Sequence, residues 1–285
     1  MNLKVIFEHP HNSWSPVNVF KTFFDWFVLN YTEHNIVFQN ADYEIKRNPN
    51  GTHSPHIMTI RNMDNAKYVI VSYWDRAIDL TWPYNGWDPE NMVDFLTSSG
   101  VHQEFNYTPF SYVCYSKEFE ILSEQRRKIF QDKQNYNLFF RGFLYGERLK
   151  MKEYKPQHFT DSRLTPEQYF DELNNSRISM SLNGAGEICN RDLEILCVGS
   201  VLLRPELNQK FHNPLIPNHH YVSVKKVSNP ERQLDLLIEK YEEIKDNFEF
   251  LNNISNNGLN WFRENGSING NVELLKKLIN LEKFK

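Results

Sequence analysis

The sequence has few cysteines, no long apolar run and no excess of basic residues. Its three cysteines among 285 residues form neither a disulfide framework nor the spacing of a metal site. The most apolar stretch, residues 20–29, is interrupted by Lys21 and Asp25, which argues against a membrane span or a secretion signal. A formal net charge of −4 argues against a nucleic-acid-binding protein. We therefore expect a cytoplasmic protein without a membrane span or a nucleic acid partner.

Three phosphate-related motifs are also missing. No Gly-x-Gly-x-x-Gly follows the first expected strand, and no Gly-x-x-x-x-Gly-Lys-Ser/Thr occurs, which argues against a dehydrogenase and a P-loop enzyme. No Asp-x-Asp is present that could hold a divalent metal on a diphosphate. The length and the 40% content of hydrophobic residues allow one large domain or two of ordinary size.

Strands and helices alternate along both halves of the chain. Residues 3–8 and 68–73 read as buried strands, and Ser15 is a suitable N-cap for a helix after the first of them. Residues 46–62 read as a loop or irregular hairpin, and a short helix is expected to end near Gly100. This alternation predicts an α/β protein with parallel sheets in both halves.

The stretch from Arg177 to Pro205 carries the clearest pattern, which is strand, glycine loop, helix and strand. The expected helix runs from Glu187 to Val198 and stops at Gly199. Two strands joined by such a helix form a βαβ unit, which places the loop at the carboxyl edge of a parallel sheet. Ligands of open α/β sheets bind at that edge.

One charged strip interrupts the apolar circumference of this helix. Glu187, Arg191 and Glu194 fall within roughly 60° of one another at helical spacing. The strip either faces a polar partner inside the protein or forms ordinary ion pairs on a solvated face, and the spacing alone leaves both open.

Residues 186–203, GEICNRDLEILCVGSVLL, resemble the pattern of exostosin-like glycosyltransferases, in which a small residue and Arg are followed by Glu, an apolar pair, Gly and a hydrophobic strand. The run is also similar to the protein O-glucosyltransferase and capsule-associated xylosyltransferase group and to virus-encoded exostosin relatives. Residues 138–142, LFFRG, with Arg148 further on, are similar to the strand and basic loop that open the donor domain of these proteins. The resemblance covers roughly residues 136–225 and implies a GT-B fold, two Rossmann-like domains facing across a cleft.

The resemblance also implies roles for particular residues. Glu194 matches the acid that binds the ribose hydroxyls, and Arg191 matches the basic residue near the diphosphate. The glycine loop would bring backbone N–H groups to the phosphates. The residues expected to bind the donor are therefore Arg141, Arg148, Asn183, Gly184, Gly186, Glu187, Arg191 and Glu194.

The reaction is expected to be metal-independent and inverting. Without an Asp-x-Asp motif, Arg141 and Arg148 would neutralise the departing diphosphate. Retaining enzymes often carry two glutamates eight positions apart, whereas Glu187 and Glu194 are seven apart. This departure favours inversion and leaves the contact of Glu187 with donor hydroxyls open.

An inverting reaction needs a general base, which normally comes from the domain opposite the nucleotide. Asp75, at the end of the strand at residues 68–73, is the candidate, although an ion pair or cap with Arg76 explains it equally well. Further acceptor-side candidates are His9, His11, Arg76, Trp82 and Trp87. The two tryptophans lie in a turn-rich segment, where they could stack on sugar rings or simply pack.

We therefore expect a glycosyltransferase that moves xylose, glucose or galactose from a UDP-sugar to a hydroxyl of a glycan, with no cofactor, in the cytoplasm of the cell, or of the host if it is virus-encoded. The acceptor-side domain would span residues 1–120 and the donor domain residues 130–252, with residues 255–285 packing back on the first. The alternatives are a non-catalytic carbohydrate-binding protein and another nucleotide-binding α/β enzyme.

Overall fold

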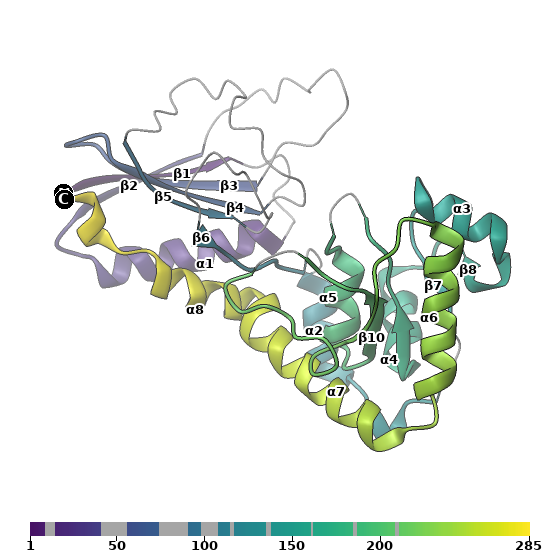
Figure 1. Cartoon of the computed structure of the whole chain (residues 1–285). Coiled ribbons are helices and arrows are strands. Elements are labelled where there is room, and N and C mark those ends of the chain that lie inside the picture. The colour runs from purple at the N-terminus through teal and green to yellow at the C-terminus, as the bar shows by residue number, and fades with distance from the viewer. Residues whose placement is uncertain are drawn as a thin grey trace. The chain divides into compact units, whose positions relative to one another are not determined.

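A computed structural model describes residues 1–8, 15–40, 56–73, 91–97, 108–114, 117–134, 138–160, 162–184, 187–208 and 211–285. The chain is a mixed α/β protein that divides into two compact units (Figure 1). The first unit comprises Met1–Tyr115, Gln209–Asn213 and Ile268–Lys285. The second comprises Ser116–Asn208 and Pro214–Ser267.

The first unit contains a six-stranded mixed sheet. Its strands, in spatial order, are β2 (Asn35–Asn40), β1 (Asn2–Glu8), β3 (His56–Asn62), β4 (Tyr68–Tyr73), β5 (Met92–Thr97) and β6 (Thr108–Pro109). Strand β3 runs antiparallel to both of its neighbours, β1 and β4. The other pairs, β1 with β2, β4 with β5 and β5 with β6, are parallel.

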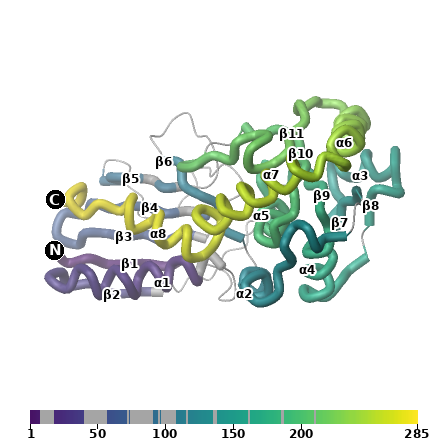
Figure 2. Tube along the Cα trace, turned by 90° about the horizontal axis from the view of Figure 1, so that it is seen from below, coloured from purple at the N-terminus to yellow at the C-terminus, as the bar shows by residue number. Residues whose placement is uncertain are grey.

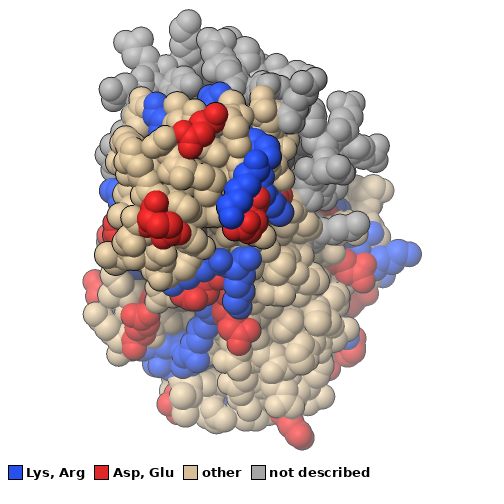
Figure 3. Space-filling model, turned by 90° about the vertical axis from the view of Figure 1, so that its left-hand side faces the viewer, with Lys and Arg blue, Asp and Glu red and all other residues tan. Residues whose placement is uncertain are grey.

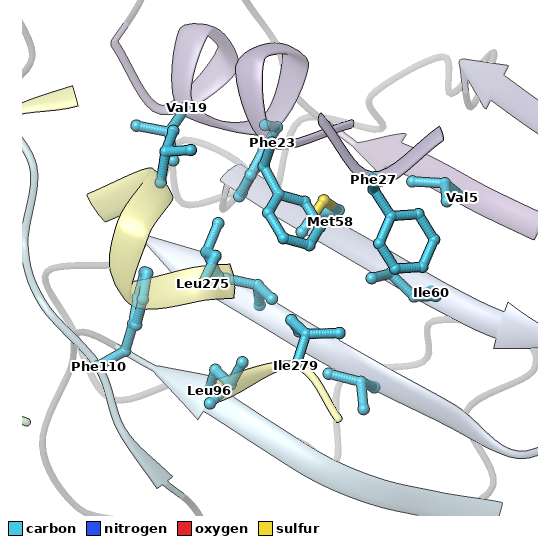
Figure 4. Packing of buried hydrophobic residues seen from close by; sticks show 14 of the residues in the cluster. Val5, Val19, Phe23, Phe27, Met58, Ile60, Leu96, Phe110, Leu275 and Ile279 are labelled. Carbon is cyan, nitrogen blue, oxygen red and sulfur yellow. The ribbon is translucent and has the colours of Figure 1, made fainter. Parts of the chain in front are cut away.

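Two helices cover one face of this sheet, and the core of the unit lies beneath them. Helix α1 (Ser15–Asn30) packs beside α8 (Ile268–Leu278), although the two lie at opposite ends of the sequence (Figure 1). Phe23 and Phe27 of α1 point toward Met58 and Ile60 of β3, with Leu275 of α8 nearby (Figure 4). The aromatic face of α1 therefore serves packing.

Three expectations for the first half are wrong. The sheet is not purely parallel because β3 is inserted antiparallel between β1 and β4. Residues 56–62, expected in a loop or irregular hairpin, form this regular central strand. Residues 57–60 are all buried, so the strand lacks the alternation of a half-buried strand. The helix expected to end near Gly100 is absent from residues 92–97, which form β5.

Opposite charges lie side by side on the surface of the first unit. Lys283 pairs with Asp94 at 2.7 Å, and Lys276 pairs with Glu273 at 2.5 Å. Figure 3 shows basic and acidic side chains interleaved on one face of the molecule. The described part of that face therefore gathers no broad area of one sign.

The second unit is built around a three-stranded parallel sheet. Its strands, in spatial order, are β11 (Val222–Val224), β10 (Val201–Pro205) and β9 (Ile178–Met180), and a separate parallel pair is formed by β7 (Phe140–Arg141) and β8 (Phe159–Thr160) (Figure 2). The α-helices of this unit are α2 (Lys117–Arg126), α3 (Glu147–Tyr154), α4 (Pro166–Asn175), α5 (Asn190–Cys197), α6 (Pro230–Ile244) and α7 (Phe248–Trp261). Helices α5 and α6 contact β10 from opposite sides (Figure 1). Burial on both sides explains why every residue of β10 is buried.

Local sequence signals determine where these helices begin and end. Thr165 and Gln168 form a capping box at the start of α4. Asn229 caps α6 by accepting a hydrogen bond from the backbone N–H of Arg232. Gly199, with φ of 65°, follows α5 in the left-handed conformation that ends many helices.

The predicted βαβ unit is confirmed as β9, α5 and β10, with β9 and β10 parallel. The expected helix boundary is wrong, however, because α5 begins at Asn190 rather than at Glu187. Asp192 defines the true start, since its carboxylate accepts a hydrogen bond of 2.6 Å from the backbone N–H of Cys189. Glu187 therefore belongs to the loop before the helix.

Candidate functional site

A cavity of about 250 Å³ lies at the carboxyl edge of the three-stranded sheet in the second unit. Asn183 follows β9, Pro205 ends β10 and Lys226 follows β11, and all three line it. Arg148 of α3 and Gln233 of α6 close its other sides. We call this the carboxyl-edge cavity. Its location is the one at which open α/β sheets bind ligands.

Arg148 is a buried cation without a carboxylate partner among the described residues. Its guanidinium donates hydrogen bonds to the carbonyl oxygens of Phe143 (3.0 Å) and Leu182 (2.7 Å), and it lies over the rings of Phe140 and Tyr145. The Nε atom is buried and has no hydrogen-bond partner in the described part of the chain. Only 7% of the residue is exposed. Since burying an uncompensated charge is costly, an anion in the adjoining cavity would complement it. The sequence places Arg148 in a loop, whereas it lies in the first turn of α3.

Arg204 organises the loop that follows β9, and the sequence reasoning missed it. Its guanidinium forms a 2.5 Å ion pair with Asp192. It also donates to the side-chain oxygen of Asn183 (2.8 Å) and to the carbonyl oxygen of Glu187 (2.5 Å). One arginine thus ties β10 to both ends of the glycine loop and to α5. A single charged residue in the otherwise apolar run VLLRP was the signal available in the sequence.

Gly184 lies close to two side chains inside this loop. A β-carbon there would lie 3.3 Å from the hydroxyl oxygen of Tyr145 and 3.4 Å from Nη2 of Arg148. The first distance is shorter than most β-carbon contacts, and the second is at the short limit of ordinary van der Waals contact. The glycine therefore lets the loop backbone lie against Arg148.

Glu187 lies beside the cavity and binds a residue that lines it. One carboxylate oxygen is 2.6 Å from Nζ of Lys226, and the other accepts a hydrogen bond of 2.8 Å from the backbone N–H of Asn208. Burial opposes ionisation, but the hydrogen bonds from Lys226 and Asn208 together hold the pKa of Glu187 below its usual value. Glu187 is therefore ionised and paired.

Arg191 and Glu194 come together, but neither lines the carboxyl-edge cavity. Tyr169 of α4 joins them, because it accepts a hydrogen bond of 2.8 Å from Arg191 and donates one of 3.0 Å to Glu194. Arg191 also donates to the carbonyl oxygen of Met180, and Asn190 donates to the second oxygen of Glu194. Of the two possibilities for the charged strip, a polar partner inside the protein is correct for these two residues, and both are buried.

Burial raises the pKa of Glu194 to about 7, although the hydrogen bond from Tyr169 and the charge of Arg191 act in the opposite direction. Each oxygen of this carboxylate already accepts one hydrogen bond from a protein side chain, Oε1 from Asn190 and Oε2 from Tyr169.

Arg141 is already neutralised by an acidic side chain. Its guanidinium forms a bidentate pair with Glu172, with a shortest distance of 2.6 Å, and binds the carbonyl oxygen and the hydroxyl of Ser162. A bidentate arginine–carboxylate pair satisfies both charges. Of the two arginines predicted to meet the diphosphate, Arg148 is the one without such a partner among the described residues.

The remaining predicted site residues lie outside the described residues. They are Gly186 in the glycine loop, Asp75 as the candidate base, and His9, His11, Arg76, Trp82 and Trp87 on the acceptor side.

These features define an α/β protein whose second unit carries a βαβ unit and, at its carboxyl edge, a cavity lined by Arg148, Lys226 and Glu147. A comparison with known protein families finds none that matches the chain, and a comparison with curated proteins finds no match either. Among the described helices, none is both long and apolar enough to cross a membrane. The described residues also contain no group of three or more His, Cys, Asp or Glu side chains able to hold a metal ion.

Proposed function

We propose that the protein is a GT-B glycosyltransferase that transfers xylose, glucose or galactose from a UDP-sugar to a hydroxyl of a glycan in the cytoplasm. The observation that carries the proposal is Arg148, a buried cation without a carboxylate partner in the described chain, at the carboxyl edge of a parallel sheet. An anionic ligand complements such a group, and a nucleotide diphosphate is an anion that α/β sheets bind at this edge.

The cavity suits one part of such a ligand. Its volume of about 250 Å³ is below the roughly 300–1,000 Å³ of sites that enclose a whole small molecule. Arg148 and Lys226 supply two positive charges to the lining, Glu147 supplies one negative charge, and Asn183 supplies a polar side chain. The diphosphate with its ribose would occupy this space, and the transferred sugar would lie beyond it.

Arg148 and Lys226 provide the chemistry expected of a metal-independent transfer. As the bond to the anomeric carbon breaks, negative charge accumulates on the departing diphosphate. Cations that are already in place stabilise that charge without reorganisation. Asp75 is the proposed base that takes the proton of the acceptor hydroxyl, which makes the reaction inverting.

A thermal-shift titration with UDP tests the proposal. At 100 times its dissociation constant, a ligand that binds only the folded chain adds about 2.7 kcal/mol to the free energy of unfolding. Arg148→Met should abolish the shift. Arg141→Met is the matched control, because Arg141 is neutralised by Glu172, and it should lower stability while the UDP shift remains.

Two results would contradict the proposal. The first is that no nucleotide diphosphate stabilises the wild-type protein. If the wild type then bound sugars without a nucleotide, the carbohydrate-binding alternative would replace the proposed function. The second is an Arg148→Met variant that keeps the full UDP shift. Turnover of a UDP-sugar should in addition be lost in Asp75→Asn while UDP binding persists.

A further inference from the structure

Glu187 joins the three loops that follow the strands of the second sheet. It belongs to the loop after β9, its partner Asn208 follows β10, and its partner Lys226 follows β11. Lys226 contacts Oε1 at 2.6 Å, while the backbone and side-chain N–H groups of Asn208 donate at 2.8 and 3.1 Å. One carboxylate therefore holds the rim of the carboxyl-edge cavity together.

The two cations that line the cavity, Arg148 and Lys226, differ in whether a carboxylate pairs with them. Arg148 has no carboxylate partner among the described residues, whereas Lys226 is paired with Glu187. Lys226 lines the same cavity as Arg148. An anion that enters the cavity and contacts both cations must compete with Glu187 for Lys226.

The Glu187–Lys226 pair is weak enough to be exchanged. Its side chains are 22% and 41% exposed, and partly exposed pairs of this kind contribute little to stability. The Arg204–Asp192 pair at the same edge is fully buried. Breaking that pair would leave an uncompensated charge inside the protein, so it does not exchange.

We propose that Glu187 is a competing counter-ion, which occupies Lys226 until the diphosphate of the ligand takes its place. This inference rests on the proposed function, because it concerns the same cavity. It gives Glu187 a role opposite to that of a ligand-binding acid. Replacing the competitor should strengthen anion binding, whereas replacing Lys226 should weaken it.

Isothermal titration calorimetry of the full chain with inorganic pyrophosphate and with UDP tests the inference. Glu187→Gln keeps the size of the side chain and most of its hydrogen bonding but removes the charge. It should tighten the binding of both probes by about three- to tenfold, since it removes a nearby negative charge and releases Lys226. Lys226→Met should weaken both by a similar factor, and Glu187→Gln should tighten binding less in the Lys226→Met background, where no lysine is released, than in the wild type.

Asp235→Asn is the matched control. Asp235 forms a 2.6 Å pair with Lys155 in the same unit, with side chains 25% and 29% exposed, and it does not line the cavity. The substitution removes the same charge from the chain as Glu187→Gln. Pyrophosphate and UDP affinities should therefore match the wild type, and an increase equal to that of Glu187→Gln would overturn the inference as an effect of net charge.

The remaining outcomes separate the inference from the proposed function. Unchanged or weaker binding of both probes in Glu187→Gln overturns the inference, and UDP binding in the wild type would leave the proposed function standing. Tighter pyrophosphate binding in Glu187→Gln, with no UDP binding by any variant, supports the counter-ion and contradicts the nucleotide-dependent function. If neither the wild type nor Glu187→Gln binds pyrophosphate, the inference is overturned.

Discussion

Arg204 and Asp192 form an ion pair of 2.5 Å in which neither side chain is exposed to solvent. Arg204 comes from β10 and Asp192 from the first turn of α5, so the pair joins the two elements on which the carboxyl edge is built. The same guanidinium reaches Asn183 and the carbonyl of Glu187. The pair therefore supports the glycine loop as well as the helix.

Replacing Arg204 should strongly destabilise the second unit. In Arg204→Met the carboxylate of Asp192 stays buried without its counter-ion, and the expected loss is about 3–5 kcal/mol of the free energy of unfolding. Urea unfolding followed by circular dichroism measures it. Arg204→Met combined with Asp192→Leu should recover part of the loss, although the cap on Cys189 stays missing. A loss below about 1 kcal/mol in the single variant would contradict the prediction.

Glu194 should make stability depend on pH. Its folded pKa of about 7 lies above the ordinary value of 4.5, so the folded state binds the proton more tightly. Its contribution is complete below pH 4.5 and is lost as the pH rises through about 7. The free energy of unfolding of Glu194→Gln, relative to that of the wild type, should therefore increase by on the order of 2 kcal/mol from about pH 5 to about pH 8. Unfolding curves of both proteins at these two pH values measure the difference, and a constant difference would refute the prediction.

Lys133 should act in the opposite direction and in a higher pH window. Its buried ammonium donates to the carbonyl oxygens of Asn174 (2.8 Å) and Val198 (2.9 Å), at the ends of α4 and α5. Burial lowers its pKa from 10.5 to about 7, so the folded state binds fewer protons between these values. Wild-type stability should rise with pH across this window.

Lys133→Met isolates this effect, because the substitution removes the titrating group and little else that ionises. The free energy of unfolding of the wild type relative to the variant should increase by on the order of 2 kcal/mol from about pH 7 to pH 9.5. Guanidinium chloride unfolding at both pH values provides the comparison. A decrease in this free-energy difference from about pH 7 to pH 9.5 would show that the pKa of Lys133 is not lowered.

Gly258 should be essential for packing in the middle of α7. A β-carbon there would lie 2.6 Å from the carbonyl oxygen of His220 and 2.8 Å from Cδ2 of Leu196. Gly258→Ala should cost about 1–3 kcal/mol despite the better helix propensity of alanine. Asn256→Ala, at an exposed position of the same helix, should leave stability within about 0.5 kcal/mol of the wild type. Thermal unfolding compares them, and equal effects of both substitutions would contradict the prediction.

The elements with strong local signals were predictable from the sequence. The apolar strand at residues 68–73 and the strand–loop–helix–strand order around α5 are confirmed. A continuous apolar run limited by turn residues identifies a buried strand, and Gly199 identifies a helix end. Strands β3 and β5 were missed because the pattern in residues 56–62 does not alternate and the segment before Gly100 follows a turn-rich region.

Charge partners could not be read from the chain order. The sequence grouped Glu187, Arg191 and Glu194 on one helix face, but α5 begins after Glu187. Tyr169 and Asn190 bind Glu194, while Lys226 and Asn208 bind Glu187. These partners lie up to 39 positions away, and no local periodicity identifies such contacts.

The sequence by itself determined the α/β class, the βαβ unit and the edge at which a ligand of such a unit binds, because hydrophobic periodicity and glycine positions are local properties of the chain. Only the tertiary structure decided which arginine is available at that edge. Arg141 and Arg148 are equivalent in the sequence, but folding places Glu172 against the first and carbonyl oxygens and aromatic rings around the second. The balance of buried charge depends on neighbours brought together by packing, and among the described residues that balance leaves Arg148 without a carboxylate partner.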